Sequence, residues 1–105
     1  MKDQWYWKEV DRKDARRLLQ SKPSGAFLLR PSRQEQYYCT LTVWFNKHLY
    51  NIPITKKMGD IFMLGTDHNT LFNSPQSMIE NYMKEPLRMS GKNGEQCTFC
   101  LQKHF

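Results

Sequence analysis

The sequence lacks the long apolar segments that mark membrane and secreted proteins. Its longest uninterrupted apolar runs are four or five residues, whereas a membrane-spanning helix needs roughly 20. No signal segment with basic, apolar and small-residue regions precedes Trp5. We therefore expect a soluble, cytoplasmic protein.

Cysteine is scarce, with three residues at Cys39, Cys97 and Cys100. An odd number does not build a disulfide framework and fits a reducing compartment. Cys97 and Cys100 have the spacing of a zinc-binding pair, and His104 lies nearby. However, no second Cys or His pair is present, and two thiols three residues apart on an extended run face opposite ways. We expect neither a metal nor another cofactor.

The motifs of common enzyme classes are also absent. The sequence contains no GxGxxG, GxxxxGK[ST] or HExxH motif. A cysteine phosphatase needs an Arg six positions after its Cys, but Phe45 follows Cys39 and Lys103 follows Cys97 at that spacing. We expect a non-catalytic protein.

The 105 residues, 39% of them hydrophobic, are enough for one core and too few for two. We expect a single domain over residues 1–105, with its core in residues 5–101. The net charge of +6 is uneven, because residues 1–57 hold twelve Lys and Arg against five Asp and Glu, whereas residues 58–105 hold four against five. This asymmetry indicates an anionic ligand at one end of the domain, unless it only promotes solubility.

Sequence periodicity predicts helices separated by strands. Asp11 is a good N-cap for a first helix with apolar positions at Ala15 and Leu19, and Pro23 ends it. Strands are expected over residues 25–30, 38–43, 49–54, 61–64 and 96–102, with a hairpin turn over 45–48.

The second helix has the clearest boundaries. Ser74 is its N-cap, Pro75 occupies the first helical position, Ile79 and Tyr82 lie on its apolar face, and Pro86 stops it. The order of elements indicates an α+β fold, a central antiparallel β-sheet flanked by two α-helices.

Arg30 ends a run, residues 25–29, that is apolar on both faces of the expected strand. Its charge should therefore point into the core, where an unpaired guanidinium is strongly unfavourable. Either a local carboxylate such as Glu35 pairs with Arg30, or the position is open to an anionic ligand.

Four segments together resemble one known family in order and spacing. They are Trp5-Tyr6, Arg12 with the apolar positions that follow it, the run from Phe27 to Ser32, and residues 72–82. The chain is similar to the Src homology 2 (SH2) domain over nearly its whole length. Residues 48–54, 64–66 and 84–87 look most like leukocyte linker adaptors of the B-cell linker class. The resemblance implies an SH2-like fold and a phosphotyrosine-peptide-binding module of an intracellular signalling adaptor.

By the resemblance, Arg30 is the bidentate anchor for phosphate, since a planar guanidinium offers two parallel N–H groups to two phosphate oxygens. Ser32 points to the same face as Arg30 if the strand persists. Its hydroxyl, with the backbone N–H groups of Arg33 to Gln36, can bind the remaining oxygen. Thr40 lies beside them as a hydroxyl donor if Leu41 faces the core. Arg12 is implied to contact the phosphate and the aromatic ring from the first helix, although it would equally suit a solvated helix face.

The third expected strand departs from the family pattern. Many relatives place a His on its pocket side, but counting back from Ile52 puts Leu49 there and His48 one residue early. A shift of one residue moves a side chain to the opposite face. We therefore expect Leu49 to wall the phosphotyrosine ring, with His48 kept as the alternative.

A second pocket, for peptide residues after the phosphotyrosine, is implied on the other side of the sheet. Its expected border is Tyr50, Leu64, Gly65, Tyr82 and Leu87. An open apolar hollow there predicts an aliphatic or Pro side chain about three residues beyond the phosphotyrosine.

The alternative function is that of a basic nucleic-acid-binding domain. Such domains spread basic and aromatic residues across an exposed sheet or helix, whereas here the basic residues concentrate in one half and the aromatics occupy core-like positions. We therefore expect tyrosine-phosphorylated segments of signalling proteins as partners of a monomeric domain, with no nucleic acid and no membrane span.

Overall fold

The computed structural model describes residues 5–65, 70–90 and 96–102. Its helices and strands, in chain order, are α1 (Arg12–Leu19), β1 (Ala26–Arg30), β2 (Cys39–Phe45), β3 (His48–Lys57), β4 (Ile61–Leu64), α2 (Pro75–Lys84), β5 (Leu87–Ser90) and β6 (Gln96–Phe99). Strands β1 to β4 form one antiparallel sheet in that order, and β5 pairs with β6 in a separate two-stranded sheet. The predicted α+β class is confirmed.

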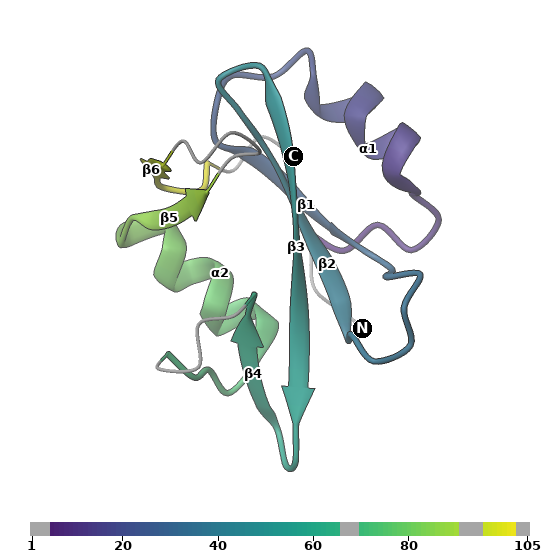
Figure 1. Ribbon diagram of the computed structural model, residues 1–105, viewed down its shortest axis with the longest axis vertical. Coiled ribbons are helices and arrows are strands. Elements are labelled where there is room, and N and C mark those ends of the chain that lie inside the picture. The colour runs from purple at the N-terminus through teal and green to yellow at the C-terminus, as the bar shows by residue number, and fades with distance from the viewer. Residues whose placement is uncertain (1–4, 66–69, 91–95, 103–105) are drawn as a thin grey trace.

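Strand β1 is buried on both faces because a helix covers each side of the main sheet. Leu28 packs in a cluster with Leu19 of α1, whereas Phe27 and Leu29 pack in a larger cluster with Ile79 of α2. Figure 1 shows α1 on one side of the sheet and α2, with β5 beside it, on the other. All five residues of β1 are buried, which explains its apolar sequence.

Side-chain caps fix both helix starts where the sequence predicts them. The Asp11 carboxylate accepts a hydrogen bond from the Asp14 backbone N–H at 2.9 Å, and the Asp14 carboxylate accepts one from the Asp11 N–H at 3.4 Å. Ser74 Oγ accepts a bond from the Ser77 N–H at 3.1 Å, and Pro75 follows at the first helical position. The first cap sets where α1 begins on the sheet.

The turn between β2 and β3 sets the register of the central hairpin. Asn46 and Lys47 both have positive φ, 50° and 65°, as the two central residues of a type I′ turn require. Phe45 therefore pairs with His48, and Thr42 pairs with Asn51. Because β3 begins at His48, every later residue of that strand has a fixed partner and face.

The structure corrects the predicted last strand. Strand β6 ends at Phe99 and pairs with β5, a strand that the sequence analysis does not predict. Gln102, predicted in the same strand, instead makes an isolated parallel bridge to Ala26, and its N–H donates to the Gly25 carbonyl at 2.8 Å. A four-residue strand carries too short an alternation to be recognised by its period.

Candidate functional site

Arg30 emerges from β1 on the α1 side of the sheet, with 7% of its surface exposed. Its Nε donates a hydrogen bond to Thr42 Oγ1 and its Nη2 donates one to Asn51 Oδ1, both at 2.9 Å. Thr42 Oγ1 also lies 2.9 Å from Asn51 Oδ1, to which it donates. Neutral groups from β2 and β3 therefore hold one edge of the guanidinium.

No carboxylate neutralises Arg30 within the described part of the chain. The ion pairs found there join Arg17 to Asp14 and Lys56 to Asp60, so the alternative of an Arg30–Glu35 pair is not supported. Burial lowers the pKa of Arg30, since removal from water disfavours the charged form.

Other charges near Arg30 act on the same pKa. Arg12 and Arg33 lower it further, and the Asp11 carboxylate opposes them with a smaller effect. The guanidinium thus sits in a positive field that an anionic ligand would relieve.

A cavity of about 530 Å³ opens above Arg30. It lies between the first turn of α1, the loop that follows β1, and strands β2 and β3. Its lining residues are Arg12, Lys13, Arg30, Ser32, Arg33, Gln34, Tyr37, Thr40, Asn51 and Pro53. We call this cavity the basic pocket, because four of these side chains are cationic and none is acidic.

The loop after β1 is folded around Ser32. Ser32 Oγ accepts a hydrogen bond from the Gln34 N–H at 3.2 Å, and the Gln34 carbonyl accepts one from the Tyr37 N–H at 3.1 Å. The first bond uses a lone pair of the Ser32 hydroxyl and leaves its O–H available to donate. The loop therefore presents a hydroxyl to the basic pocket.

The structure brings together five of the seven residues predicted around the phosphate. Arg30, Arg12, Ser32, Arg33 and Thr40 all line the basic pocket. Sequence reasoning missed the lining residues Lys13, Tyr37, Asn51 and Pro53, and it included Gln34 only through its backbone N–H.

The placement of Leu49 and His48 is corrected. Leu49 lies on the predicted face of β3, but it pairs with Trp44 near the turn and packs against the cluster around α1. His48 pairs with Phe45 at the turn and is exposed. Asn51, two residues further along β3 and on the same face as Leu49, takes the expected place. Counting the pairs outward from the hairpin turn would have found it.

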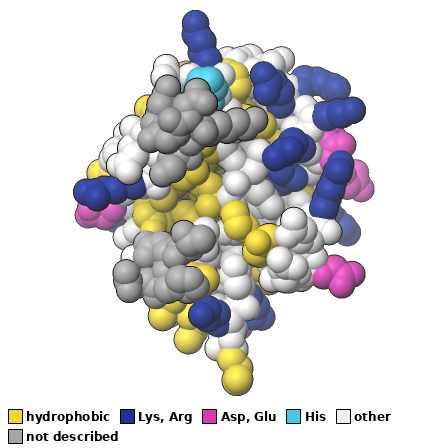
Figure 2. Space-filling view, in the orientation of Figure 1, with side chains coloured by type: hydrophobic (Ala, Val, Ile, Leu, Met, Phe, Trp, Pro, Cys, Tyr) yellow, Lys and Arg dark blue, Asp and Glu magenta, His cyan; other side chains and the backbone are white. Residues whose placement is uncertain are grey.

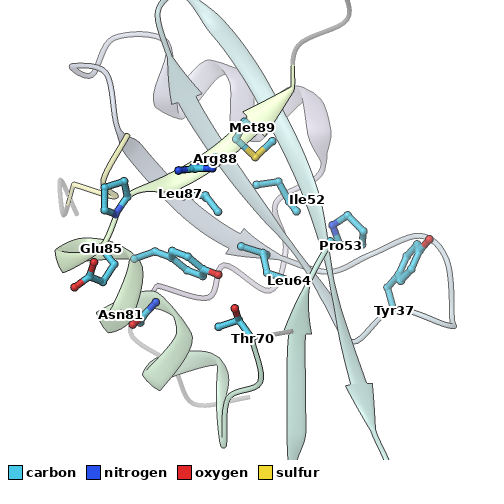
Figure 3. A pocket seen from close by; sticks show the side chains of 13 residues that line it. Tyr37, Ile52, Pro53, Leu64, Thr70, Asn81, Glu85, Leu87, Arg88 and Met89 are labelled. Carbon is cyan, nitrogen blue, oxygen red and sulfur yellow. The ribbon is translucent and has the colours of Figure 1, made fainter. Parts of the chain in front are cut away.

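A second cavity of about 750 Å³ lies between β3, β4, α2 and β5 (Figure 3). It is lined by Tyr37, Ile52, Pro53, Leu64, Gly65, Thr70, Asn81, Tyr82, Glu85, Pro86, Leu87, Arg88 and Met89. We call it the apolar pocket, because Ile52, Leu64 and Leu87 form its floor, with Asn81, Glu85 and Arg88 around them.

Four of the five residues predicted for this second site line the apolar pocket, namely Leu64, Gly65, Tyr82 and Leu87. Tyr50 is the exception and is corrected. Its hydroxyl accepts a hydrogen bond from Cys97 Sγ at 3.6 Å, and its ring is tilted against Phe99. The β5–β6 pair, which was not foreseen, therefore takes Tyr50 as a packing partner.

The two pockets are neighbours on one surface, because Tyr37 and Pro53 line both. In Figure 2, Lys and Arg side chains gather on the side where α1 lies, and hydrophobic side chains fill the central hollow beside them. Strand β3 supplies residues to both pockets. An extended ligand across this strand would meet charge first and apolar surface next.

Metal ligands and membrane-spanning helices were also considered in the sequence. In residues 5–65, 70–90 and 96–102, no three His, Cys, Asp or Glu side chains converge as metal ligands. His104, considered with Cys97 and Cys100 for zinc, lies outside the described residues. None of the described helices is long and apolar enough to cross a membrane.

Comparison with known proteins identifies the family. The SH2 domain model matches residues 5–82, and the chain belongs to the SH2 domain family. Its relatives include B-cell linker protein from Rattus norvegicus, 37% identical over 79% of this chain and 20% of the relative. Cytokine-inducible SH2-containing protein from Gallus gallus is 31% identical over 75% of this chain and 33% of the relative. The chain thus spans about a fifth to a third of these relatives' lengths.

A solved structure supports the fold independently. The VAV1 SH2 domain, determined in complex with a tyrosine-phosphorylated peptide from SLP76, matches with a TM-score of 0.64. The two are 20% identical, and the match covers 76% of this chain and 56% of that chain. The predicted SH2 family and fold are confirmed. The predicted similarity to the B-cell linker class is confirmed as well.

Proposed function

We propose that this chain binds tyrosine-phosphorylated peptides, with the phosphate in the basic pocket and the following residues in the apolar pocket. The observation that carries the proposal is the state of Arg30, a guanidinium with 7% exposure and no carboxylate partner among the described residues. Membership in the SH2 family supports the same ligand class.

The hydrogen bonds of Arg30 leave some of its guanidinium N–H groups available to a ligand. A guanidinium has five N–H groups, and Thr42 and Asn51 take the parallel pair formed by Nε and one N–H of Nη2. The end formed by Nη1 and the second N–H of Nη2 remains, apart from a long 3.5 Å contact to the Pro31 carbonyl. That end matches two oxygens of a phosphate in bidentate fashion.

The other residues of the basic pocket complete a dianion site. A phosphotyrosine carries about −1.5 to −2 charge at pH 7 and three strong acceptor oxygens. Arg12 and Arg33 supply charge, and Ser32 and Thr40 supply hydroxyl donors to the oxygen that Arg30 does not bind. Because Arg30 is recessed, the long tyrosine ring delivers phosphate to it and the short phosphoserine side chain does not.

The apolar pocket supports selectivity for residues after the phosphotyrosine. Ile52, Leu64 and Leu87 offer an apolar floor, so an aliphatic or Pro side chain would bury surface there. We propose that the peptide crosses β3 at Pro53 and passes Tyr37, since both residues border both pockets.

We further propose that residues 1–105 act as one monomeric, non-catalytic SH2 domain and serve a cytoplasmic signalling adaptor. The adaptor class rests on the similarity to B-cell linker protein, of which this chain spans about a fifth. The nucleic-acid alternative is less well supported, because four of the cationic side chains line one pocket, whereas nucleic-acid-binding domains spread basic residues across an open face.

Calorimetry with a phosphotyrosyl peptide and its unphosphorylated twin tests the proposal. We expect binding of the phosphorylated peptide alone, and equal binding of both would overturn the proposal. Arg30→Lys should weaken binding by about thirtyfold or more, since an ammonium cannot reproduce the bidentate contact.

Two residues of one helix provide a matched pair for the same assay. Arg12→Ala should weaken binding, because Arg12 lines the basic pocket, whereas Arg16→Ala should not, because Arg16 is exposed on α1 and does not line it. Equal effects of the two substitutions would contradict the proposed place of the phosphate.

A further inference from the structure

The basic pocket carries more positive charge than one phosphate requires. Arg30, Arg12, Arg33 and Lys13 line it, and none of its lining residues is acidic. A bound phosphotyrosine brings about two negative charges at most. Part of the cationic wall is therefore left for another anionic group.

The surplus cation is Lys13. Asp11 partly compensates Arg33, since the pKa of Asp11 is lowered chiefly by the Asp14 N–H and to a smaller extent by Arg33. Lys13 joins neither of the ion pairs found in the described residues. Lys13 is exposed and lines the basic pocket.

Lys13 and Arg12 both line the basic pocket but leave the helix in different directions. Consecutive residues of an α-helix point about 100° apart, so the two side chains approach the pocket from different sides. Both also occupy the first turn of α1, where the helix dipole disfavours cations. An anion bound beside Lys13 would offset that unfavourable placement.

The course of the peptide identifies the anion. If the residues after the phosphotyrosine run toward the apolar pocket, those before it leave the basic pocket on the opposite side, where α1 lies. We infer that Lys13 selects an acidic side chain immediately N-terminal to the phosphotyrosine. This inference rests on the proposed function and adds a specificity determinant to the same site.

Three phosphotyrosyl peptides with identical residues in the first five positions after the phosphotyrosine test the inference. The first has two Glu residues directly before the phosphotyrosine, the second has two Gln residues there, and the third keeps the Gln pair but carries two Glu residues at its distant C-terminal end. At low salt, we expect the first to bind about fivefold more tightly than the other two. Equal affinity of the first and third peptides would overturn the inference, because net charge alone would then explain the preference.

Substitutions assign the preference to one side chain. Lys13→Gln should bind the first and second peptides equally, whatever its effect on the affinity common to both, and Arg16→Gln on the same helix should keep the wild-type preference. A preference that persists in Lys13→Gln overturns the inference while leaving the proposed function intact. Failure of the wild-type domain to bind any of the three peptides would instead overturn the proposed function.

Discussion

Thr42 and Asn51 stand opposite each other in the β2–β3 hairpin, and each accepts one N–H of the Arg30 guanidinium at 2.9 Å. Thr42 also donates its own proton to Asn51, so the three side chains form a closed network. This network fixes the plane of the guanidinium before any ligand arrives. Pre-organisation of this kind reduces the ordering cost of binding.

Thr42→Val tests the network, because valine keeps the β-branched shape but leaves the Arg30 Nε–H without an acceptor. The free energy of unfolding should fall by about 1 to 3 kcal/mol, and phosphopeptide affinity should fall with it as the fork loses its fixed orientation. Urea denaturation and calorimetry measure the two effects. Thr55→Val, on β3 outside both pockets, is the control. Wild-type affinity in Thr42→Val would show that Thr42 does not position Arg30.

Asn51→Asp would place a carboxylate next to Arg30 Nη2, where the amide oxygen now lies at 2.9 Å. The new charge pairs with the guanidinium and repels phosphate, so phosphopeptide affinity should fall by about tenfold or more. The domain should remain folded, since the buried cation gains a counter-ion. Calorimetry and thermal unfolding separate these outcomes, and retained affinity would argue against phosphate binding at Arg30.

Leu87 and Tyr50 were both predicted for the second pocket, but substitutions of the two should have different effects. Leu87→Ala removes an apolar wall of the apolar pocket and should alter preference for residues after the phosphotyrosine. Tyr50→Phe should leave that preference unchanged, because Tyr50 packs on Phe99 outside the pocket. An oriented phosphopeptide library measures the sequence preference of both variants. A changed preference in Tyr50→Phe alone would contradict the assignment.

The cap of α1 predicts a pH dependence of stability. The pKa of Asp11 lies below its ordinary value of 3.8, chiefly because its carboxylate accepts the Asp14 N–H. A lowered folded pKa stabilises the fold above the unfolded pKa, and this contribution is lost as the pH falls through the folded value. Asp11→Asn keeps a cap acceptor but does not titrate.

Thermal unfolding from about pH 6 to about pH 2.5 reveals this contribution. The difference in Tm between the wild-type domain and Asp11→Asn should shrink as the pH falls below about 4. A constant difference over the whole range would mean that the Asp11 charge does not stabilise α1.

The sequence predicted those parts of the fold that local chemistry determines. Asp11 and Ser74 cap helices with their own side chains, and the apolar run before Arg30 is buried on both faces as its composition indicates. The position of Arg30 followed from the same pattern. Each of these features depends on residues close together in the chain.

The errors arose where one element depends on the register of another. Leu49 and Asn51 share a face of β3, and only the pairing outward from Asn46 and Lys47 decides which of them reaches Arg30. Tyr50 was misplaced because its neighbour Phe99 belongs to β6, which pairs with a strand too short to show a period. Long-range pairing is the information that a single sequence expresses least.

Tyr37 and Pro53 line both pockets, and this constrains any peptide segment that occupies the two pockets at once. Such a segment must pass Tyr37 and Pro53 on its way from the basic pocket to the apolar pocket. The distance between the two pockets therefore selects ligands by the spacing between an anionic group and an apolar side chain. A segment with the right groups at the wrong spacing fills only one pocket.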